Sequence, residues 1–137
     1  MAGFRLLLAD DDEDDFFIIS QAFEEFGRPY ELQYVRNGKE LLDRLNVIQV
    51  PDLIVLDINM PLVNGYEALE QIRSTSAYAS VPVFVYSTSE DNGEKHKCMM
   101  LGANAFFTKA YTYKKVQSFV TDIDLFLNYP HRMPQPL

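Results

Sequence analysis

Five polar side chains stand at the ends of short apolar segments of the sequence, or directly after them. They are Asp10, Asp11, Asp57, Ser87 and Lys109. If those segments are parallel strands of one open sheet, their carboxyl ends meet at a single edge, where such sheets bind ligands. Three carboxylates, one hydroxyl and one ammonium group would then converge there, and hydrophobic periodicity alone would not produce this arrangement.

Carboxylates gathered in this way need a positively charged partner. Two unit charges about 4 Å apart repel each other by roughly 4 kcal/mol at an effective dielectric constant of about 20. Mg²⁺ is commonly held by one or two carboxylates together with water and phosphate oxygens, and Mn²⁺ also suits oxygen ligands. We therefore expect Mg²⁺ or Mn²⁺ at this edge, bound directly by Asp11 and Asp57, and by Asp10 mostly through water.

Some of these polar residues have simpler explanations. The acids from Asp12 to Asp15 suit the first turn of a helix, where each gains about 0.3 to 1 kcal/mol from the helix dipole, and we assign them to capping. A lysine such as Lys109 is most often a solvated surface residue, and a serine such as Ser87 is a common strand-end residue. Their positions at the ends of apolar strands favour a functional interpretation.

The apolar patterning predicts five strands that alternate with five helices. The predicted strands are residues 4–9, 31–35, 53–56, 81–86 and 105–108. The predicted helices are residues 13–26, a short helix around 41–45, 66–73, 91–101 and a last helix around 116–127. Parallel neighbours need right-handed crossover connections, so this order predicts an α/β fold, a doubly wound parallel sheet covered on both faces.

Length and composition narrow the function classes. The chain has 137 residues, and we expect one domain over residues 1–128 followed by a C-terminal tail over residues 129–137. Its longest apolar runs are too short to span a bilayer, and its start lacks the pattern of a signal peptide, so we expect a cytoplasmic protein without membrane insertion. A net charge of −8 argues against direct nucleic-acid binding.

Four motifs in this order resemble the receiver domains of two-component signalling over residues 4–127. They are LLLADDDEDD, IVLDINMPLVNG, VFVYSTS and FFTKA. The resemblance implies a flavodoxin-like sheet with strand order 2-1-3-4-5 and five helices. It also implies that Asp57 is the phosphoacceptor, that a sensor histidine kinase or a phosphotransfer protein supplies the phosphoryl group, and that the chain is a signalling protein rather than an enzyme. The first motif resembles small stand-alone regulators, including those that serve phytochrome-type sensor kinases and often form dimers.

The resemblance assigns roles to further residues. The backbone carbonyl of Asn59 would complete the metal ligands, and Lys109 would help to neutralise the phosphoryl oxygens in the transition state. Ser87 would donate a hydrogen bond to the phosphoryl group and act as a switch together with Phe106. Since Phe106 lacks the hydroxyl of the tyrosine often found there, any such coupling must depend on packing.

Two departures from the family pattern affect the site. Alanine follows Lys109 where the family usually has proline after a cis bond; a cis bond to a residue other than proline costs about 2.5 to 4 kcal/mol, so we favour a trans Lys109–Ala110 bond. Thr88 stands where family members often have alanine or glycine, and its bulk should slow both the gain and the loss of phosphate. Ser89 and Asn59 could also tune these rates.

Output and rival functions complete the sequence-based expectations. No second domain follows the last helix, so we expect signalling through a downstream protein partner or onward phosphotransfer, with a possible homodimer through the last strand and the helices beside it. Adaptable and aromatic side chains in that region are Met99, Met100, Tyr111, Tyr113 and Phe119. An aspartyl phosphatase would carry a second acid at position 59, and a flavodoxin-like cofactor binder would need a phosphate loop where six acids stand. A phosphorylation-independent interaction module stays open as the alternative.

Overall fold

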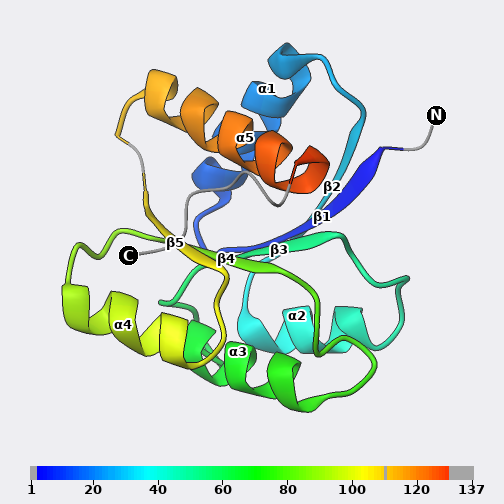
Figure 1. Ribbon diagram of the computed structural model, residues 1–137, viewed down its shortest axis with the longest axis vertical. Coiled ribbons are helices and arrows are strands. Elements are labelled where there is room, and N and C mark those ends of the chain that lie inside the picture. The colour runs from blue at the N-terminus through cyan, green and yellow to red at the C-terminus, as the bar shows by residue number, and fades with distance from the viewer. Residues whose placement is uncertain (1–2, 110, 130–137) are drawn as a thin grey trace.

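Ten elements alternate between strand and helix in the computed structural model, which describes residues 3–109 and 111–129 (Figure 1). The strands are Phe4–Ala9 (β1), Tyr30–Val35 (β2), Leu53–Leu56 (β3), Val83–Ser87 (β4) and Ala105–Thr108 (β5). The helices are Glu13–Phe26 (α1), Gly38–Leu45 (α2), Gly65–Ser74 (α3), Asn92–Met100 (α4) and Tyr113–Asn128 (α5). The predicted number, order and type of elements are confirmed.

The five strands form one parallel sheet in the order β2-β1-β3-β4-β5. All residues of the two strands β3 and β4 are buried, whereas those of the edge strands β2 and β5 are mostly half-buried or exposed. A central parallel strand has helices on both faces, which explains its continuous apolar sequence. The flavodoxin-like topology that the resemblance implied is confirmed.

Two apolar cores separate the sheet from its helices. Helices α1 and α5 lie together on one face, and α2, α3 and α4 cover the other (Figure 1). Successive residues of β1 show the division, because Leu6 and Leu8 pack in the core with α1 and α5, while Leu7 and Ala9 pack in the opposite core. This alternation fixes the register of the strand, since a slip by one residue would exchange the two faces.

Local signals in the sequence set several helix ends. Asp12 caps α1 by accepting a hydrogen bond from the backbone N–H of Asp14, and Gly27 ends that helix in the left-handed region at φ 82°. At α3, Asn64 and Glu67 form a reciprocal capping box. The capping function predicted for the acidic run is therefore confirmed at Asp12, and the stop predicted at Gly27 is confirmed as well.

Three details differ from the sequence-based expectations. Strand β4 begins at Val83 rather than at residue 81, because Pro82 has no N–H to donate to a sheet ladder. Ser87 is the last residue of that strand instead of following it. Phe119, which we counted among possible interface side chains, is buried beneath α5 and stacks with Tyr86, so no partner can reach it in this fold.

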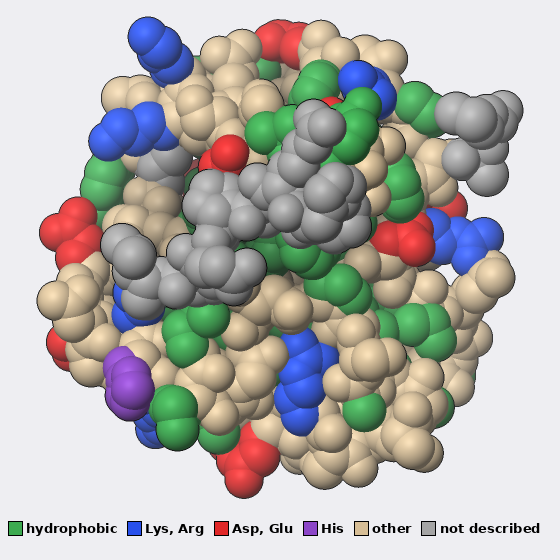
Figure 2. Space-filling view, in the orientation of Figure 1, with side chains coloured by type: hydrophobic (Ala, Val, Ile, Leu, Met, Phe, Trp, Pro, Cys, Tyr) green, Lys and Arg blue, Asp and Glu red, His purple; other side chains and the backbone are tan. Residues whose placement is uncertain are grey.

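Two further observations concern the helices and the surface of the described residues. Among them, no helix combines the length and the apolar character needed to cross a bilayer. In the view of Figure 2, Lys and Arg side chains lie at several separate places and do not form one patch. Of the predicted tail, only Tyr129 belongs to the described part of the chain.

Candidate functional site

The backbone carries the predicted site residues to one edge of the sheet. The N–H of Asp57 donates to the carbonyl of Ala9 at 2.9 Å, and the N–H of Asp10 donates to Val35 at 3.1 Å. Across the sheet, the N–H of Lys109 donates to the carbonyl of Ser87 at 2.6 Å. These bonds continue the ladders beyond the strand ends, so the side chains that follow β1, β3 and β5 emerge at the same edge.

Three carboxylates converge at this edge in an arrangement that fits a divalent cation. Asp10, Asp11 and Asp57 each offer one oxygen, and these atoms all lie within 4.8 Å of one another. Asp10 and Asp57 are buried, whereas Asp11 is exposed. One oxygen of Asp10 accepts the N–H of Asp12 at 2.8 Å, but its other oxygen, Oδ2, is buried without a hydrogen bond. Lys109 lies 3.0 Å from this oxygen, and a bound cation would offset the remaining cost of burying it.

The electrostatics of these acids reflect their crowding. Burial, with a contribution from the nearby charge of Asp57, raises the pKa of Asp10 to about 7, against the lowering effects of the hydrogen bond from Asp12 and of Lys109. Burial also raises the pKa of Asp57, although Lys109 acts in the opposite direction. Both carboxyl groups therefore hold their protons more firmly than a solvated aspartate does, and a bound cation would favour their ionised forms.

Lys109 lies among three carboxylates rather than beside one. Its Nζ is 2.7 Å from Asp15 Oδ2, 3.0 Å from Asp10 Oδ2 and 3.4 Å from Asp57 Oδ2. The contact with Asp10 is an ion pair without hydrogen-bond geometry. Burial by itself would lower the pKa of Lys109, but the hydrogen bond with Asp15 and the charges of Asp57 and Asp10 outweigh it and raise the pKa. Lys109 is therefore a fixed positive charge at the centre of the site.

The loop after Asp57 returns close to the site and depends on a glycine. Its Gly65 donates its N–H to the carbonyl of Ile58 at 2.8 Å, and a Cβ at position 65 would overlap with the backbone of Asp57 and Ile58. Within the loop, Leu62 has a positive φ of 70° and is the centre of a tight turn closed by the N–H of Val63 on Pro61. The glycine at the end of the IVLDINMPLVNG motif thus permits a close approach of α3 to the aspartate.

The residues after β4 are tied to one another and to α4. Ser87 is buried, and its hydroxyl oxygen accepts the N–H of Ser89 at 3.2 Å. The hydroxyl of Ser89 in turn donates to Glu94 on α4 and accepts the N–H of Asp91. Thr88 is exposed, as its predicted effect on access to the site requires.

The remaining predicted site residues lie at the margins of the cluster. Phe106 is half-buried and packs against the core beneath α2, α3 and α4, and its coupling to Ser87 stays a prediction. Asn59 is exposed two positions beyond Asp57. The Lys109–Ala110 peptide bond lies outside the described residues, so its predicted trans form stays a prediction.

Sequence reasoning missed two residues of the site. Asp15, which we assigned to helix capping, makes the shortest contact of Lys109. Tyr34 at the end of β2 donates its hydroxyl to the backbone carbonyl of Asp10 at 2.8 Å and stacks on Phe16 with 4.5 Å between the ring centroids. The sequence held a weak signal for Asp15, because it is the third residue of α1 and the first turn of this helix lies near the end of β1. Charge alone could not distinguish Asp15 from its acidic neighbours.

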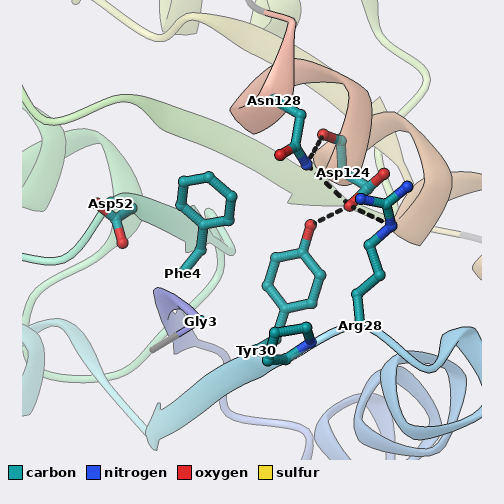
Figure 3. A pocket seen from close by; sticks show the side chains of 8 residues that line it. Gly3, Phe4, Arg28, Tyr30, Asp52, Asp124 and Asn128 are labelled. Atoms are coloured by element: carbon teal, nitrogen blue, oxygen red, sulfur yellow. Dashed lines mark hydrogen bonds and ion pairs between the residues drawn. The ribbon is translucent and has the colours of Figure 1, made fainter. Parts of the chain in front are cut away.

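A second polar cluster lies at the opposite edge of the sheet, around a pocket of about 420 Å³ (Figure 3). Its centre is the buried Asp124 on α5, whose Oδ1 accepts the hydroxyl of Tyr30 at 2.6 Å and the amide of Asn128 at 3.1 Å. Arg28 approaches the same oxygen at 3.6 Å. The pocket is lined by the amino-terminal ends of β1 and β2, far along the strands from Asp57.

Comparisons with known proteins agree with this geometry. A family model described as "Response regulator receiver domain" matches residues 6–121. The probable methanogenesis regulatory protein FilR2 of Methanothrix harundinacea is 27% identical over 138 residues, which cover 97% of this chain and 89% of that protein. This chain spans only 21% to 56% of the length of seven other curated relatives.

Two solved structures share both the fold and appreciable sequence identity. The phosphorylated cyanobacterial phytochrome response regulator RcpA is 28% identical, with a TM-score of 0.87 over 98% of this chain and 100% of that chain. The bacteriophytochrome response regulator RtBRR is 32% identical, with a TM-score of 0.75 over 90% of this chain and 77% of that chain. Both neighbours are response regulators that their descriptions connect with phytochromes.

Proposed function

Because the chain belongs to the family of response regulator receiver domains, we propose that it signals by accepting a phosphoryl group on Asp57. One observation carries this proposal. The carboxylate of Asp57 is buried, lies 3.4 Å from the ammonium of Lys109, and shares a 4.8 Å cluster with Asp10 and Asp11. A nucleophilic carboxylate, a fixed positive charge and a cradle for a cation are the parts that phosphoryl transfer needs.

In the proposed reaction, an oxygen of Asp57 forms a bond to phosphorus while the bond from phosphorus to the donor breaks. The leaving group is the histidine nitrogen of a sensor kinase or phosphotransfer protein, or acetate when acetyl phosphate is the donor. Lys109 neutralises part of the charge on the phosphoryl oxygens. Its raised pKa keeps it protonated throughout the physiological range.

Asp10, Asp11, Asp57 and the backbone carbonyl of Asn59 would hold Mg²⁺ or Mn²⁺, which would supply further positive charge to the phosphoryl oxygens. The Oδ2 atom of Asp10 supports this assignment, because it is buried, accepts no hydrogen bond and shares the single ammonium of Lys109 with two other carboxylates, which leaves it able to bind a cation. Metal binding should also return the pKa of Asp10 from about 7 towards its ordinary range.

The proposed output begins at Ser87. In the resting arrangement its hydroxyl oxygen accepts a hydrogen bond from Ser89, so its proton is available to a phosphoryl oxygen on Asp57. Movement of the segment after β4 towards the phosphate would shift Ser89, and the hydrogen bond from Ser89 to Glu94 would carry this shift to the start of α4. Phe106 would follow by packing into the space released beside β4.

The proposed partners follow from the family and its relatives. A sensor histidine kinase, of the phytochrome type by analogy with RcpA and RtBRR, would donate the phosphoryl group in the cytoplasm. A downstream protein, or a second copy of the chain, would contact α4, β5 and α5. Met100 and Tyr111, with 74% and 84% of their surface exposed, are available for such a contact.

Mass measurement after incubation with acetyl phosphate and Mg²⁺ tests the proposal. We expect the parent protein to gain one phosphoryl group and to bind beryllofluoride, and Asp57→Asn to do neither, because both need the Asp57 carboxylate. If the parent gains no phosphoryl group from acetyl phosphate or from any kinase, the chain is a phosphorylation-independent interaction module instead.

The exposed Thr88 provides a test of the predicted rate control. Replacing it with alanine removes bulk beside the entrance to Asp57, so we expect Thr88→Ala to be labelled faster and to lose its phosphoryl group faster than the parent. Rates measured by acetyl-phosphate labelling and by dephosphorylation after donor removal check this. Unchanged rates would remove Thr88 from the list of rate-controlling residues.

A further inference from the structure

The ammonium of Lys109 is held more closely by Asp15 than by the proposed phosphoacceptor. The distance from Nζ to Asp15 Oδ2 is 2.7 Å, against 3.4 Å to Asp57 Oδ2. The first distance is that of a short charge-assisted hydrogen bond, and the second is at the outer limit of hydrogen bonding. In this arrangement Lys109 belongs primarily to α1 and only secondarily to the end of β3.

The position of Asp15 is fixed by its backbone and shielded from solvent. It lies in the first turn of α1, where its N–H donates to the carbonyl of the capping residue Asp12 at 3.1 Å. Tyr34 holds the preceding segment by its hydrogen bond to the carbonyl of Asp10. The side chains of Asp15 and Lys109 are only 23% and 10% exposed, so solvent screens their interaction less than it would screen a surface ion pair.

From this geometry, and on the basis of the function proposed above, we infer that Asp15 is a positioning residue that competes with the phosphoryl group on Asp57 for Lys109. It holds the ammonium in the resting site and must share it, or release it, once a phosphoryl oxygen arrives. Asp15 does not belong to the group of carboxylates formed by Asp10, Asp11 and Asp57, and in this role it acts through Lys109 and through its charge.

Two opposite effects follow from this competition. In the resting site, Asp15 draws positive charge away from Asp10 and Asp57 and so favours the binding of a cation there. In the phosphorylated site, the same carboxylate keeps Lys109 from a doubly charged phosphoryl group and adds a negative charge nearby. Asp15 therefore favours the metal-bound resting state and disfavours the phosphorylated state, and its removal should shift the balance the other way.

The test uses Asp15→Asn, which keeps the size of the side chain and removes its charge. Affinity for Mg²⁺ alone is measured by tyrosine fluorescence or amide chemical shifts, and affinity for beryllofluoride, an analogue of the phosphoryl group, is measured at saturating Mg²⁺. We expect Asp15→Asn to bind Mg²⁺ about three- to tenfold more weakly and beryllofluoride about three- to tenfold more tightly than the parent, the range for loss of one ordinary hydrogen bond, because the asparagine amide can still contact Lys109.

Matched variants separate this role from a merely structural one. Asp14→Asn removes a charge from the same helical turn at an exposed position and should change each affinity less than twofold. Asp15→Glu, which can still reach Lys109, should restore values near those of the parent. Urea unfolding checks that each variant is folded, because a distorted site would weaken the binding of both ligands.

The outcomes distinguish this inference from the function on which it rests. Opposite changes for the two ligands in Asp15→Asn support it. If the parent is phosphorylated on Asp57 but Asp15→Asn changes both affinities in the same direction, or changes neither, the inference is wrong and the phosphoacceptor function stands. If the parent neither binds beryllofluoride nor accepts a phosphoryl group, the proposed function fails, and the inference fails with it.

Discussion

Two aspartates are buried at opposite edges of the same sheet, and their surroundings differ. Asp124, 4% exposed, has an oxygen that is shared by Tyr30, Asn128 and Arg28 (Figure 3). Asp10, 0% exposed, has one oxygen without a hydrogen bond and lies near other carboxylates. A buried carboxylate with donors around it stabilises the fold, whereas one that shares a single lysine with other acids costs stability and is a candidate binding site.

We call the sheet edge with Asp10, Asp57 and Lys109 the active edge and the opposite edge, with Tyr30 and Asp124, the structural edge. The largest difference in stability between variants at the two edges is expected when Asp124 is removed. Asp124→Ala leaves the hydroxyl of Tyr30 and the guanidinium of Arg28 without their acceptor, so we expect the free energy of unfolding to fall by about 2 to 4 kcal/mol. Urea denaturation measures it. Asp122→Ala, two residues away on α5 and without a hydrogen bond or ion pair to any residue that the structure describes, is the control and should cost less than about 1 kcal/mol. Equal losses for the two variants would show that Asp124 has no special structural role.

In the metal-free protein at neutral pH, we expect the charge of Asp10 to lower the free energy of unfolding, whereas Asp124 raises it. Its pKa of about 7 lies above its ordinary value, so between about pH 4 and 7 the folded state holds a proton that the unfolded chain has released. The stability from this group is complete at low pH and is lost as the pH rises towards 7. We expect the free energy of unfolding in EDTA to fall by about 1 to 3 kcal/mol from pH 5 to pH 8.

The variant Asp10→Asn isolates this effect. Because it cannot ionise, we expect a flatter pH profile and, at pH 8, greater stability than the metal-free parent. Added Mg²⁺ should stabilise the parent more at pH 8 than at pH 5, since the cation competes with protons for the same oxygens. A parent profile as flat as that of Asp10→Asn would contradict the account of Asp10 as a buried acid with a raised pKa.

A smaller effect is expected from the removal of a single donor at the structural edge. Tyr30→Phe deletes the hydroxyl that donates to Asp124 at 2.6 Å and keeps the ring that packs on Phe23. We expect a loss of about 1 to 2 kcal/mol in unfolding free energy, without a change in acetyl-phosphate labelling. Tyr113→Phe, which removes an exposed hydrogen bond to Glu25, is the matched control and should cost less. If Tyr30→Phe changed the rate of acetyl-phosphate labelling as strongly as the free energy of unfolding, the two edges would not have separate roles.

The smallest effect is expected at Arg28. Its side chain is 54% exposed and 3.6 Å from Asp124, so solvent screens the pair, and the hydrogen bonds from Tyr30 and Asn128 remain without it. We expect Arg28→Gln to cost about 0.5 kcal/mol or less, with a correspondingly small dependence on salt. Thermal unfolding at low and high salt measures both quantities. A loss as large as that of Asp124→Ala would mean that Arg28, and not the hydrogen bonds, compensates the buried charge.

The same two edges show how far sequence reasoning reached. The active edge was predictable, because Asp57 and Lys109 directly follow apolar strands and a parallel sheet must bring strand ends together. The structural edge was not predicted. Tyr30, at the first position of β2, and Asp124, in the middle of α5, are 94 positions apart, and nothing local in the sequence marks them as partners.

Within the active edge, the residue types were also a limited guide. Asp12 and Asp15 looked equivalent in the acidic run, yet Asp12 caps α1 while Asp15 contacts Lys109. The difference arises from the direction of each side chain at the start of the helix. Likewise, Phe119 has the composition of an interface residue, but the helical phase of α5 turns it towards Tyr86.

The sequence by itself determined the order of the elements, the two-sided sheet and the convergence of acids with Lys109, because periodicity and strand ends are local properties that topology then combines. Only the tertiary structure decided which carboxylate holds Lys109 most closely, which oxygen of Asp10 accepts no hydrogen bond and which buried acid is surrounded by donors. These are differences of a few tenths of an ångström between groups far apart in the chain, and they depend on how whole helices pack against the sheet.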